Sequence, residues 1–280
     1  MQRVIRKVFV SKVFERKVVM ITGACAGIGR ALALRFAQAG ARLVLLDQDG
    51  PALDSLVQHL RDHLNAESLA LCCDVADAEC VQASVTRAIE QFGGIDVLIN
   101  NAGITHRSAF ADTDLAVFRR VMAVNYFGAL HCTQAALPSL RARRGQIIVL
   151  SSLSGFAPML HRSAYNASKH ALHGLFESLR LELEGSGVNV MLVCPGFTAT
   201  DIRKNALKGD GSVIARPIPL VGKVSSAHDT AEAIYRAARR RKRLLVHSNV
   251  NWLARQLARF APALFERWLV PRLSGVRVGQ

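Results

Sequence analysis

The stretch KVVMITGACAGIG, residues 17–29, decides the fold of this chain. An apolar run of strand length leads directly into a segment with glycines at positions 23, 27 and 29, and a helix-forming segment follows. Such glycines permit a tight turn, let backbone amides approach a pyrophosphate, and allow the helix to pack closely on the sheet. Because they lie between a strand and a helix, they predict a dinucleotide-binding loop rather than an ordinary turn.

Further apolar runs of strand length recur along the chain, separated by helix-length segments. They cover residues 42–47, 68–74, 95–100, 146–151, 188–194 and 243–247. Most are apolar without interruption, which is typical of parallel strands covered by helices on both faces. The alternation predicts a single α/β domain over residues 17–247, a Rossmann-type doubly wound sheet of seven parallel strands. Ligands bind such sheets at the carboxyl ends of the strands.

The formal net charge of +15 is located at the two ends of the chain. Residues 18–235 hold 19 basic and 19 acidic side chains, so the other 17 basic and 2 acidic ones lie outside them. We therefore predict a basic N-terminal extension, residues 1–16, and a basic amphipathic C-terminal extension, residues 248–280. The Arg-rich start fits a basic tail or surface helix better than a transit peptide.

The apolar runs and the cysteines indicate in which cellular compartment the protein is found. No run reaches the roughly 18 to 20 residues that cross a bilayer, and the chain starts without the continuous apolar core of a secretory signal. The six cysteines show no metal-binding spacing such as C-x-x-C. We expect a cytoplasmic protein with reduced, mostly buried thiols and no metal site.

Asp47 ends the second predicted strand, 18 residues after Gly29. At about this distance an acid reaches the ribose hydroxyls of a bound dinucleotide. A carboxylate there would repel the 2′-phosphate of NADP, and neither Ala26 nor Gln48 supplies a compensating cation. NAD is therefore favoured over NADP, with a simple loop cap as the alternative reading of Asp47.

The segment YNASK places Tyr165 and Lys169 one helical turn apart, so the two side chains share a face of the predicted helix. With the other motifs, this segment resembles the short-chain dehydrogenase/reductase family over roughly residues 17–247. The matching motifs are TGACAGIG (22–29), CDV (73–75), NNAG (100–103), Asn125 in AVNYFG, Ser152 in VLSS, YNASK (165–169) and PGFTAT (195–200).

The resemblance implies roles for four catalytic residues. Tyr165 would be the general acid or base, with the charges of Lys169 and the nicotinamide favouring its phenolate. Ser152, 13 residues before Tyr165, would hydrogen-bond the substrate oxygen. Asn125 would hold a water for proton relay through the lysine. Each residue alone has a structural alternative, as a cap, an interior polar group or a solvated charge.

The resemblance also implies a set of cofactor contacts. Asp74 and Val75 would flank the adenine, residues 101–103 would brace the central sheet, and PGFTAT would meet the carboxamide. The full implied set is Gly23, Ala26, Gly27, Ile28, Gly29, Asp47, Asp74, Val75, Asn101, Ala102, Gly103, Tyr165, Lys169, Pro195, Gly196, Thr198 and Thr200.

Residues 201–226 are rich in glycine and proline and predict a mobile lid with an apolar patch at residues 218–221. An apolar lid favours a small hydrophobic alcohol or ketone, such as a steroid, a retinoid or a long-chain lipid, although a lid that closes over any substrate fits equally. Two alternatives remain: a reductase of ketoacyl groups on an acidic carrier protein, and a non-catalytic NAD-binding regulator or membrane scaffold. The intact catalytic set argues against the regulator.

The C-terminal extension has helical periodicity. Apolar residues recur at positions 253, 257, 260, 264 and 268, Arg255, Arg259 and Glu266 fall on the opposite face, and Pro262 is expected to split the stretch into two helices. A basic, aromatic helix of this kind can lie on the cytoplasmic face of a membrane. It can equally cover the substrate cleft or pack between subunits, since the resemblance implies a homodimer or homotetramer. No base-stacking module is present, so nucleic acid is not an expected partner.

Overall fold

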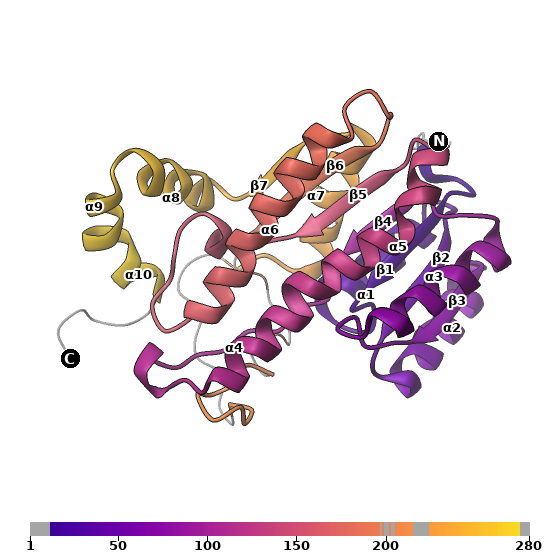
Figure 1. Cartoon of the computed structure of the whole chain (residues 1–280). Coiled ribbons are helices and arrows are strands. Elements are labelled where there is room, and N and C mark those ends of the chain that lie inside the picture. The colour runs from indigo at the N-terminus through magenta and orange to yellow at the C-terminus, as the bar shows by residue number, and fades with distance from the viewer. Residues whose placement is uncertain (1–11, 197, 199–201, 203–204, 215–223, 275–280) are drawn as a thin grey trace, which may run out of the picture.

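The computed structural model describes residues 12–196, 198, 202, 205–214 and 224–274. Seven parallel strands form one sheet in the order β3-β2-β1-β4-β5-β6-β7, which confirms the predicted fold class (Figure 1). Their bounds are β1 Val18–Thr22, β2 Arg42–Asp47, β3 Ser68–Cys72, β4 Val97–Asn100, β5 Gln146–Leu150, β6 Asn189–Pro195 and β7 Leu244–His247. Each lies within two residues of its predicted range.

Helices cover both faces of the sheet. On one face lie α1 Gly27–Ala37, α2 Gly50–Leu64 and α7 Ala227–Arg239. On the other lie α3 Ala78–Phe92, α5 Gly128–Ala142 and α6 Ser163–Glu182, with α4 Leu115–Met122 packed against α6. Because helices cover both faces of the sheet, β1 is buried at all five positions. A strand that is buried on both faces needs apolar side chains on both, and this explains why the strands show no apolar–polar alternation.

Short helical turns complete the domain. The 3₁₀ turns are η1 Lys12–Phe14, η2 Phe110–Asp112 and η4 Leu153–Gly155, and a π-helix, η3 Ala123–Phe127, joins α4 to α5. The side chains of Asp49, Asp77 and Ser226 cap the first turns of α2, α3 and α7.

Phe14 belongs to the main core although it precedes the predicted domain. Its ring lies 4.9 Å from that of Phe36 and 5.4 Å from that of Tyr235, measured between centroids. The predicted N-terminal extension, residues 1–16, therefore contributes its last residues to the packed domain.

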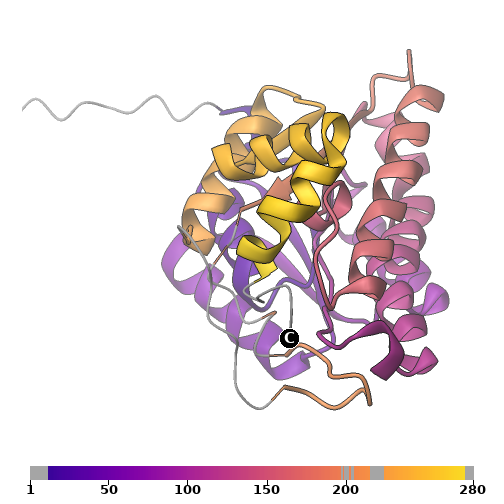
Figure 2. The same ribbon diagram turned by 90° about the vertical axis from the view of Figure 1, so that its left-hand side faces the viewer.

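The C-terminal arm, defined here as residues 248–274, projects beyond the carboxyl ends of the strands (Figures 1 and 2). It comprises α8 Asn249–Phe260, α9 Pro262–Leu264, the π-helix η6 Phe265–Leu269 and α10 Val270–Ser274. Pro262 is the first residue of α9, so the predicted break is present. None of the helices in the described ranges is long and apolar enough to span a bilayer.

The basic run at residues 239–243 precedes β7, whereas the arm follows it, so the two lie at opposite ends of that strand. Arg241 donates hydrogen bonds to the carbonyls of Arg144, Gly145 and Gly187. These carbonyls immediately precede β5 and β6. Arg241 thus ties together the amino ends of two strands.

Candidate active site

The glycine loop between β1 and α1 has the backbone that the sequence predicts. Gly23 and Gly27 adopt φ values of +64° and +52°, a region that side chains disfavour. A methyl group at Gly29 would overlap the Gly23 carbonyl oxygen. The loop is therefore a close-packed cradle at the first turn of α1, where backbone amides can receive an anion.

Asn101 and Thr22 fix the loop to the centre of the sheet. The Asn101 Nδ2 donates to the carbonyls of Thr22 and Gly23, at 2.9 and 3.0 Å. The Thr22 hydroxyl accepts from the backbone amides of Asn101 and Ala102, both at 3.0 Å. These bonds join the ends of β1 and β4, where the strand order reverses. The predicted bracing role of residues 101–103 fits this geometry, and Thr22 is a partner that the motif analysis missed.

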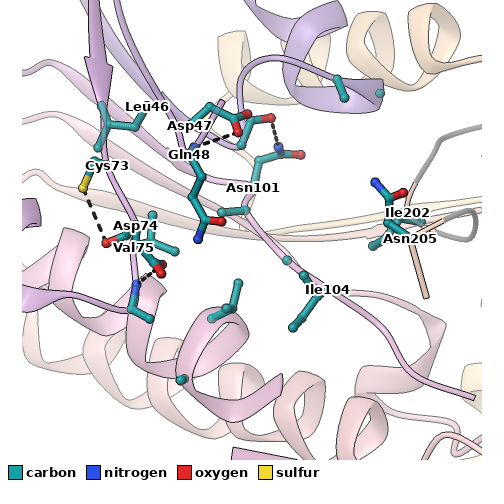
Figure 3. A pocket seen from close by; sticks show the side chains of 18 of the residues that line it. Leu46, Asp47, Gln48, Cys73, Asp74, Val75, Asn101, Ile104, Ile202 and Asn205 are labelled. Atoms are coloured by element: carbon teal, nitrogen blue, oxygen red, sulfur yellow. Dashed lines mark hydrogen bonds between the residues drawn. The ribbon is translucent and has the colours of Figure 1, made fainter. Parts of the chain in front are cut away.

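A cavity of about 490 Å³ opens beside this loop, at the carboxyl ends of β1 to β4 (Figure 3). Ten of the predicted cofactor contacts line it: Gly23, Ala26, Gly27, Ile28, Asp47, Asp74, Val75, Asn101, Ala102 and Gly103. Gly29 does not line it and acts through close packing instead. The glycine cradle, the switch in strand order and the polar lining fit a dinucleotide.

Asp47 faces this cavity and also braces the glycine loop (Figure 3). One carboxylate oxygen accepts from the Cys25 amide at 2.9 Å, and the other from the Gln48 amide at 2.8 Å. A carboxylate offers about four acceptor positions, so capacity remains for ribose hydroxyls. The loop-cap reading and the ribose reading are therefore compatible.

A second, smaller pocket of about 150 Å³ adjoins the first and shares Ile28, Asn101, Gly103 and Ile202 with it. The structure brings together here the predicted residues Ser152, Tyr165, Lys169, Pro195, Gly196 and Thr198. The Thr198 hydroxyl donates to the Gly196 carbonyl. Thr200 and the predicted apolar patch at residues 218–221 lie outside the described residues.

Burial raises the pKa of Tyr165 above its usual value. A hydrogen bond with the Ser152 hydroxyl and the positive charge of Arg162 oppose this shift. The protein alone therefore keeps the phenol protonated, as a proton donor requires.

Lys169 is buried on the same face of α6 as Tyr165. Its Nζ donates to the Leu150 carbonyl at 2.8 Å and lies 5.7 Å from the centre of the Tyr165 ring. Burial lowers the pKa of Lys169 to about 8. The amine thus titrates near working pH, beside the phenol that it is predicted to assist.

Asn125 lies in the π-helix η3, buried between the loop after β4 and α6. Its Oδ1 accepts from the Ile104 amide at 2.8 Å, and its Nδ2 donates to the Ile104 carbonyl at 3.0 Å and the Ser168 hydroxyl at 2.9 Å. The carboxamide is therefore engaged as a brace. A role in holding water stays a prediction.

A family model described as short chain dehydrogenase matches residues 17–211. The chain belongs to the short-chain dehydrogenase/reductase family. It is 38% identical over 263 residues to Dehydrogenase/reductase SDR family member 7B of Xenopus tropicalis, covering 91% of this chain and 85% of that one. The protein of the same name from Mus musculus is 36% identical over 268 residues, covering 94% and 83%.

A solved short-chain dehydrogenase/reductase from Burkholderia phymatum, in complex with NAD, has the same fold. The TM-score is 0.80 at 28% identity, and the match covers 90% of this chain and 95% of that one. This short-chain dehydrogenase/reductase is thus an oxidoreductase of a family that uses a nicotinamide nucleotide.

Several residues of this short-chain dehydrogenase/reductase line its pockets without having been predicted. Arg162 and Asn251 line the smaller pocket, Arg120 and Asn205 the larger one, and Ile202 both. Arg162, three residues before Tyr165, could have been found from its place in the catalytic segment. Asn251 could not have been found from the sequence, because its helix belongs to a segment predicted to be a separate C-terminal extension. Within the described residues, no group of three His, Cys, Asp or Glu side chains could hold a metal ion.

A polar chain next to Ser152 was also missed. His173 Nε2 lies 3.0 Å from the Ser151 hydroxyl, and His173 Nδ1 lies 3.6 Å from the Glu177 carboxylate. The Ser151 hydroxyl in turn donates to the Lys169 carbonyl at 3.4 Å. Burial lowers the pKa of His173, although Glu177 opposes the shift.

Proposed function

We propose that the protein interconverts a secondary alcohol and a ketone by hydride transfer, with NAD(H) as the coenzyme. One observation carries the proposal: Ser152, Tyr165 and Lys169 line a single pocket that adjoins the dinucleotide cavity. A substrate in that pocket lies beside both the proton donor and the coenzyme.

The chain's own residues supply binding and proton transfer. When bound, the nicotinamide donates or accepts the hydride. In the reductive direction, Tyr165 gives its proton to the substrate oxygen, which Ser152 holds by a hydrogen bond. Lys169 then stabilises the phenolate that forms. Oxidation reverses these steps.

The choice of NAD over NADP is supported by Asp47. Its carboxylate faces the larger cavity at the end of β2, where it would repel a 2′-phosphate. The Burkholderia phymatum structure, which holds NAD, adds support by likeness.

The choice of a hydrophobic substrate is supported by the lining of the smaller pocket. Ile28, Leu150, Leu153, Pro195 and Ile202 form apolar parts of its wall. We propose a ketone or alcohol on an apolar body, such as a steroid, a retinoid or a long-chain lipid. The two alternatives, a carrier-bound ketoacyl group and a non-catalytic role, become outcomes of the experiment.

The test is a titration of the full chain with NADH and NADPH, followed by turnover of a panel of ketones, in the wild type and in Tyr165→Phe. We expect tighter binding of NADH, reduction of long apolar ketones, and at least about a 100-fold loss of turnover in Tyr165→Phe with NADH affinity retained. Tight NADH binding without turnover of any ketone would favour the regulator. Turnover only of a carrier-bound ketoacyl group would favour the carrier alternative.

Asp47→Asn tests the coenzyme choice, because it removes the charge while keeping an oxygen for the Cys25 amide. We expect the preference for NADH over NADPH to shrink in this variant. An unchanged preference would exclude the proposed role of Asp47.

A homodimer or homotetramer also remains a proposal. It is supported by apolar side chains exposed along α4 to α6, namely Leu115, Phe127 and Leu181. Light scattering on the eluting protein tests it, and a monomer at micromolar concentration would contradict it.

A further inference from the structure

The outer face of the C-terminal arm is apolar, the reverse of an ordinary surface helix. The exposed fractions are 55% for Trp252, 48% for Leu253, 74% for Phe260 and 46% for Leu264. All four lie within 13 consecutive residues of α8 and α9. A soluble monomer rarely gathers large apolar side chains in this way.

The inner side of the arm already has a partner within the chain. Ala254, Phe265 and Val270 form a buried cluster with Leu153 and Met159, from the segment that follows the catalytic Ser152. The Asn251 Nδ2 donates to the Pro195 carbonyl at 2.8 Å, and Asn251 lines the smaller pocket. Through Asn251 the arm thus forms part of the wall of that pocket, and none of the four exposed apolar side chains belongs to the buried cluster.

Exposed cations lie on the same arm as the exposed apolar side chains. The Arg259 guanidinium lies 5.5 Å from the centre of the exposed Phe260 ring. Arg267 and Arg272 are also exposed, and Glu266 is the single acidic residue of positions 248–274. Aromatic and aliphatic side chains next to arginine are what a helix needs in order to lie in the headgroup region of an anionic bilayer.

We propose that the outer face of the C-terminal arm binds the surface of an anionic lipid bilayer, through Trp252, Leu253, Phe260 and Leu264 with Arg259 and Arg267. Because the inner side of the same arm lines the smaller pocket, binding brings that pocket to the membrane, where apolar ketones and alcohols are concentrated. This last step rests on the proposed function, whereas the binding itself does not.

Two other occupants fit the surface less well. In a symmetric contact with a second copy, the arginines of both arms would be brought together, which opposes association. An acidic carrier protein would satisfy the arginines but would leave the apolar side chains without a matching surface. A bilayer with anionic headgroups satisfies both.

The first measurement uses the full chain carrying Trp268→Phe, which leaves Trp252 as its sole tryptophan. It is mixed with phosphatidylcholine vesicles that contain no phosphatidylglycerol or about one third of it, and binding is followed by flotation and tryptophan emission. We expect flotation and a blue shift with the anionic vesicles, weakened by added salt. Absence of both would overturn the proposal.

A matched pair of variants locates the surface. Phe260→Glu places a charge on the outer face, and Phe110→Glu places one on the 3₁₀ turn η2 at a similar exposure, 74% against 75%. We expect Phe260→Glu to weaken vesicle affinity at least about tenfold and Phe110→Glu to leave it unchanged. Equal loss in both variants, or in neither, would show that another surface binds lipid.

Two controls separate this proposal from the others. NADH affinity and turnover of a water-soluble ketone without vesicles should be the same in Phe260→Glu and the wild type. A loss of vesicle binding in this variant can then be distinguished from a loss of enzymatic activity. A change in oligomeric state by light scattering in Phe260→Glu, with no vesicle binding by the wild type, would assign the surface to a second copy instead.

Discussion

Gly29 lies so close to the start of the loop that any side chain there would meet backbone. A β-carbon would overlap the Gly23 carbonyl oxygen and crowd the Asn101 amide. Neither group can move freely, because both belong to the hydrogen bonds that join β1 to β4. The residue most resistant to change in this loop is therefore one that does not line the cavity.

Gly29→Ala should consequently lower NADH affinity at least about tenfold and lower the unfolding midpoint. The matched control is Gly174→Ala on α6, where a β-carbon would meet nothing within 4 Å. That variant should be neutral or up to about 1 kcal/mol more stable, because alanine favours helix. Calorimetry and fluorescence titration measure both, and equal behaviour would refute the packing role.

Lys169 makes stability depend on pH. Burial lowers its pKa from 10.5 to about 8, so below pH 8 the folded state holds a buried charge that disfavours it. Between pH 8 and 10.5 the folded state releases a proton that the unfolded chain keeps, and the penalty is progressively relieved. Without coenzyme, Lys169→Met should therefore be more stable than the wild type at pH 7, by an amount on the order of 3 kcal/mol.

Urea unfolding of both proteins at several pH values checks this, since the difference between them cancels the titration of other groups. The difference in free energy of unfolding between Lys169→Met and the wild type should narrow as pH rises from 8 to 10.5. A constant gap would mean that Lys169 does not titrate in this range.

At the scale of elements, α6 organises the site through residues spaced four apart. Tyr165, Lys169, His173 and Glu177 follow one another on one face, and the first two line the smaller pocket. The His173 imidazole extends from this face to the hydroxyl of Ser151, the residue before Ser152. Room for it exists because residue 155 is glycine, since a β-carbon there would crowd both the Ser151 hydroxyl and the imidazole.

His173 should therefore act as a positioning residue for the end of β5. We expect His173→Phe to lower kcat by about tenfold with little change in NADH affinity. Glutamine retains a donor and should restore most of the loss. If Phe and Gln variants behave alike, the hydrogen bond to Ser151 has no role in positioning.

The sequence predicted elements well where a local pattern specifies them. The apolar runs marked all seven strands within two residues, and Pro262, with no amide hydrogen, marked the end of α8. The π-helix around Asn125 could not be predicted, because its widened turn follows from contacts with Ile104 and Ser168 that are distant in sequence.

The same distinction holds for the candidate site. The motifs identified residues at the strand ends, and the structure gathers most of those that it describes around two adjoining pockets, whereas Gly29 and Asn125 line neither. Asn251 and His173 were not predicted, because no local sequence pattern indicates their roles. Asn251 lies on an arm that folds back over the pocket, and His173 contacts Ser151 only in the folded structure. The basic run at residues 239–243 lies before β7 and the arm after it.

At the scale of the whole molecule, the arm contributes to one pocket and not to the other. Asn251 lines the smaller pocket, whereas none of the arm side chains that the structure describes lines the dinucleotide cavity. Substitutions on the arm's inner side should therefore alter ketone kinetics independently of coenzyme binding.

Asn251→Ala tests this, because it removes the bond to the Pro195 carbonyl. We expect the KM for the ketone to rise severalfold while NADH affinity is unchanged. Asn249→Ala, at an exposed position of the same helix, should change neither. A parallel loss of NADH affinity in Asn251→Ala would mean that the arm supports the whole site.

The pairing of β1 with β4 also affects the order in which the strands can pair during synthesis. The Val18 amide donates a hydrogen bond to the carboxylate of Asp96, which lies 78 residues further along the chain, just before β4. β1 lies at the centre of the sheet, between β2 and β4. During synthesis, the edge of β1 that pairs with β4 stays unpaired until β4 has left the ribosome, although β2 can already pair with the other edge. The nascent chain therefore carries an exposed apolar edge in this interval, and chaperones that bind it protect the chain before β4 is available.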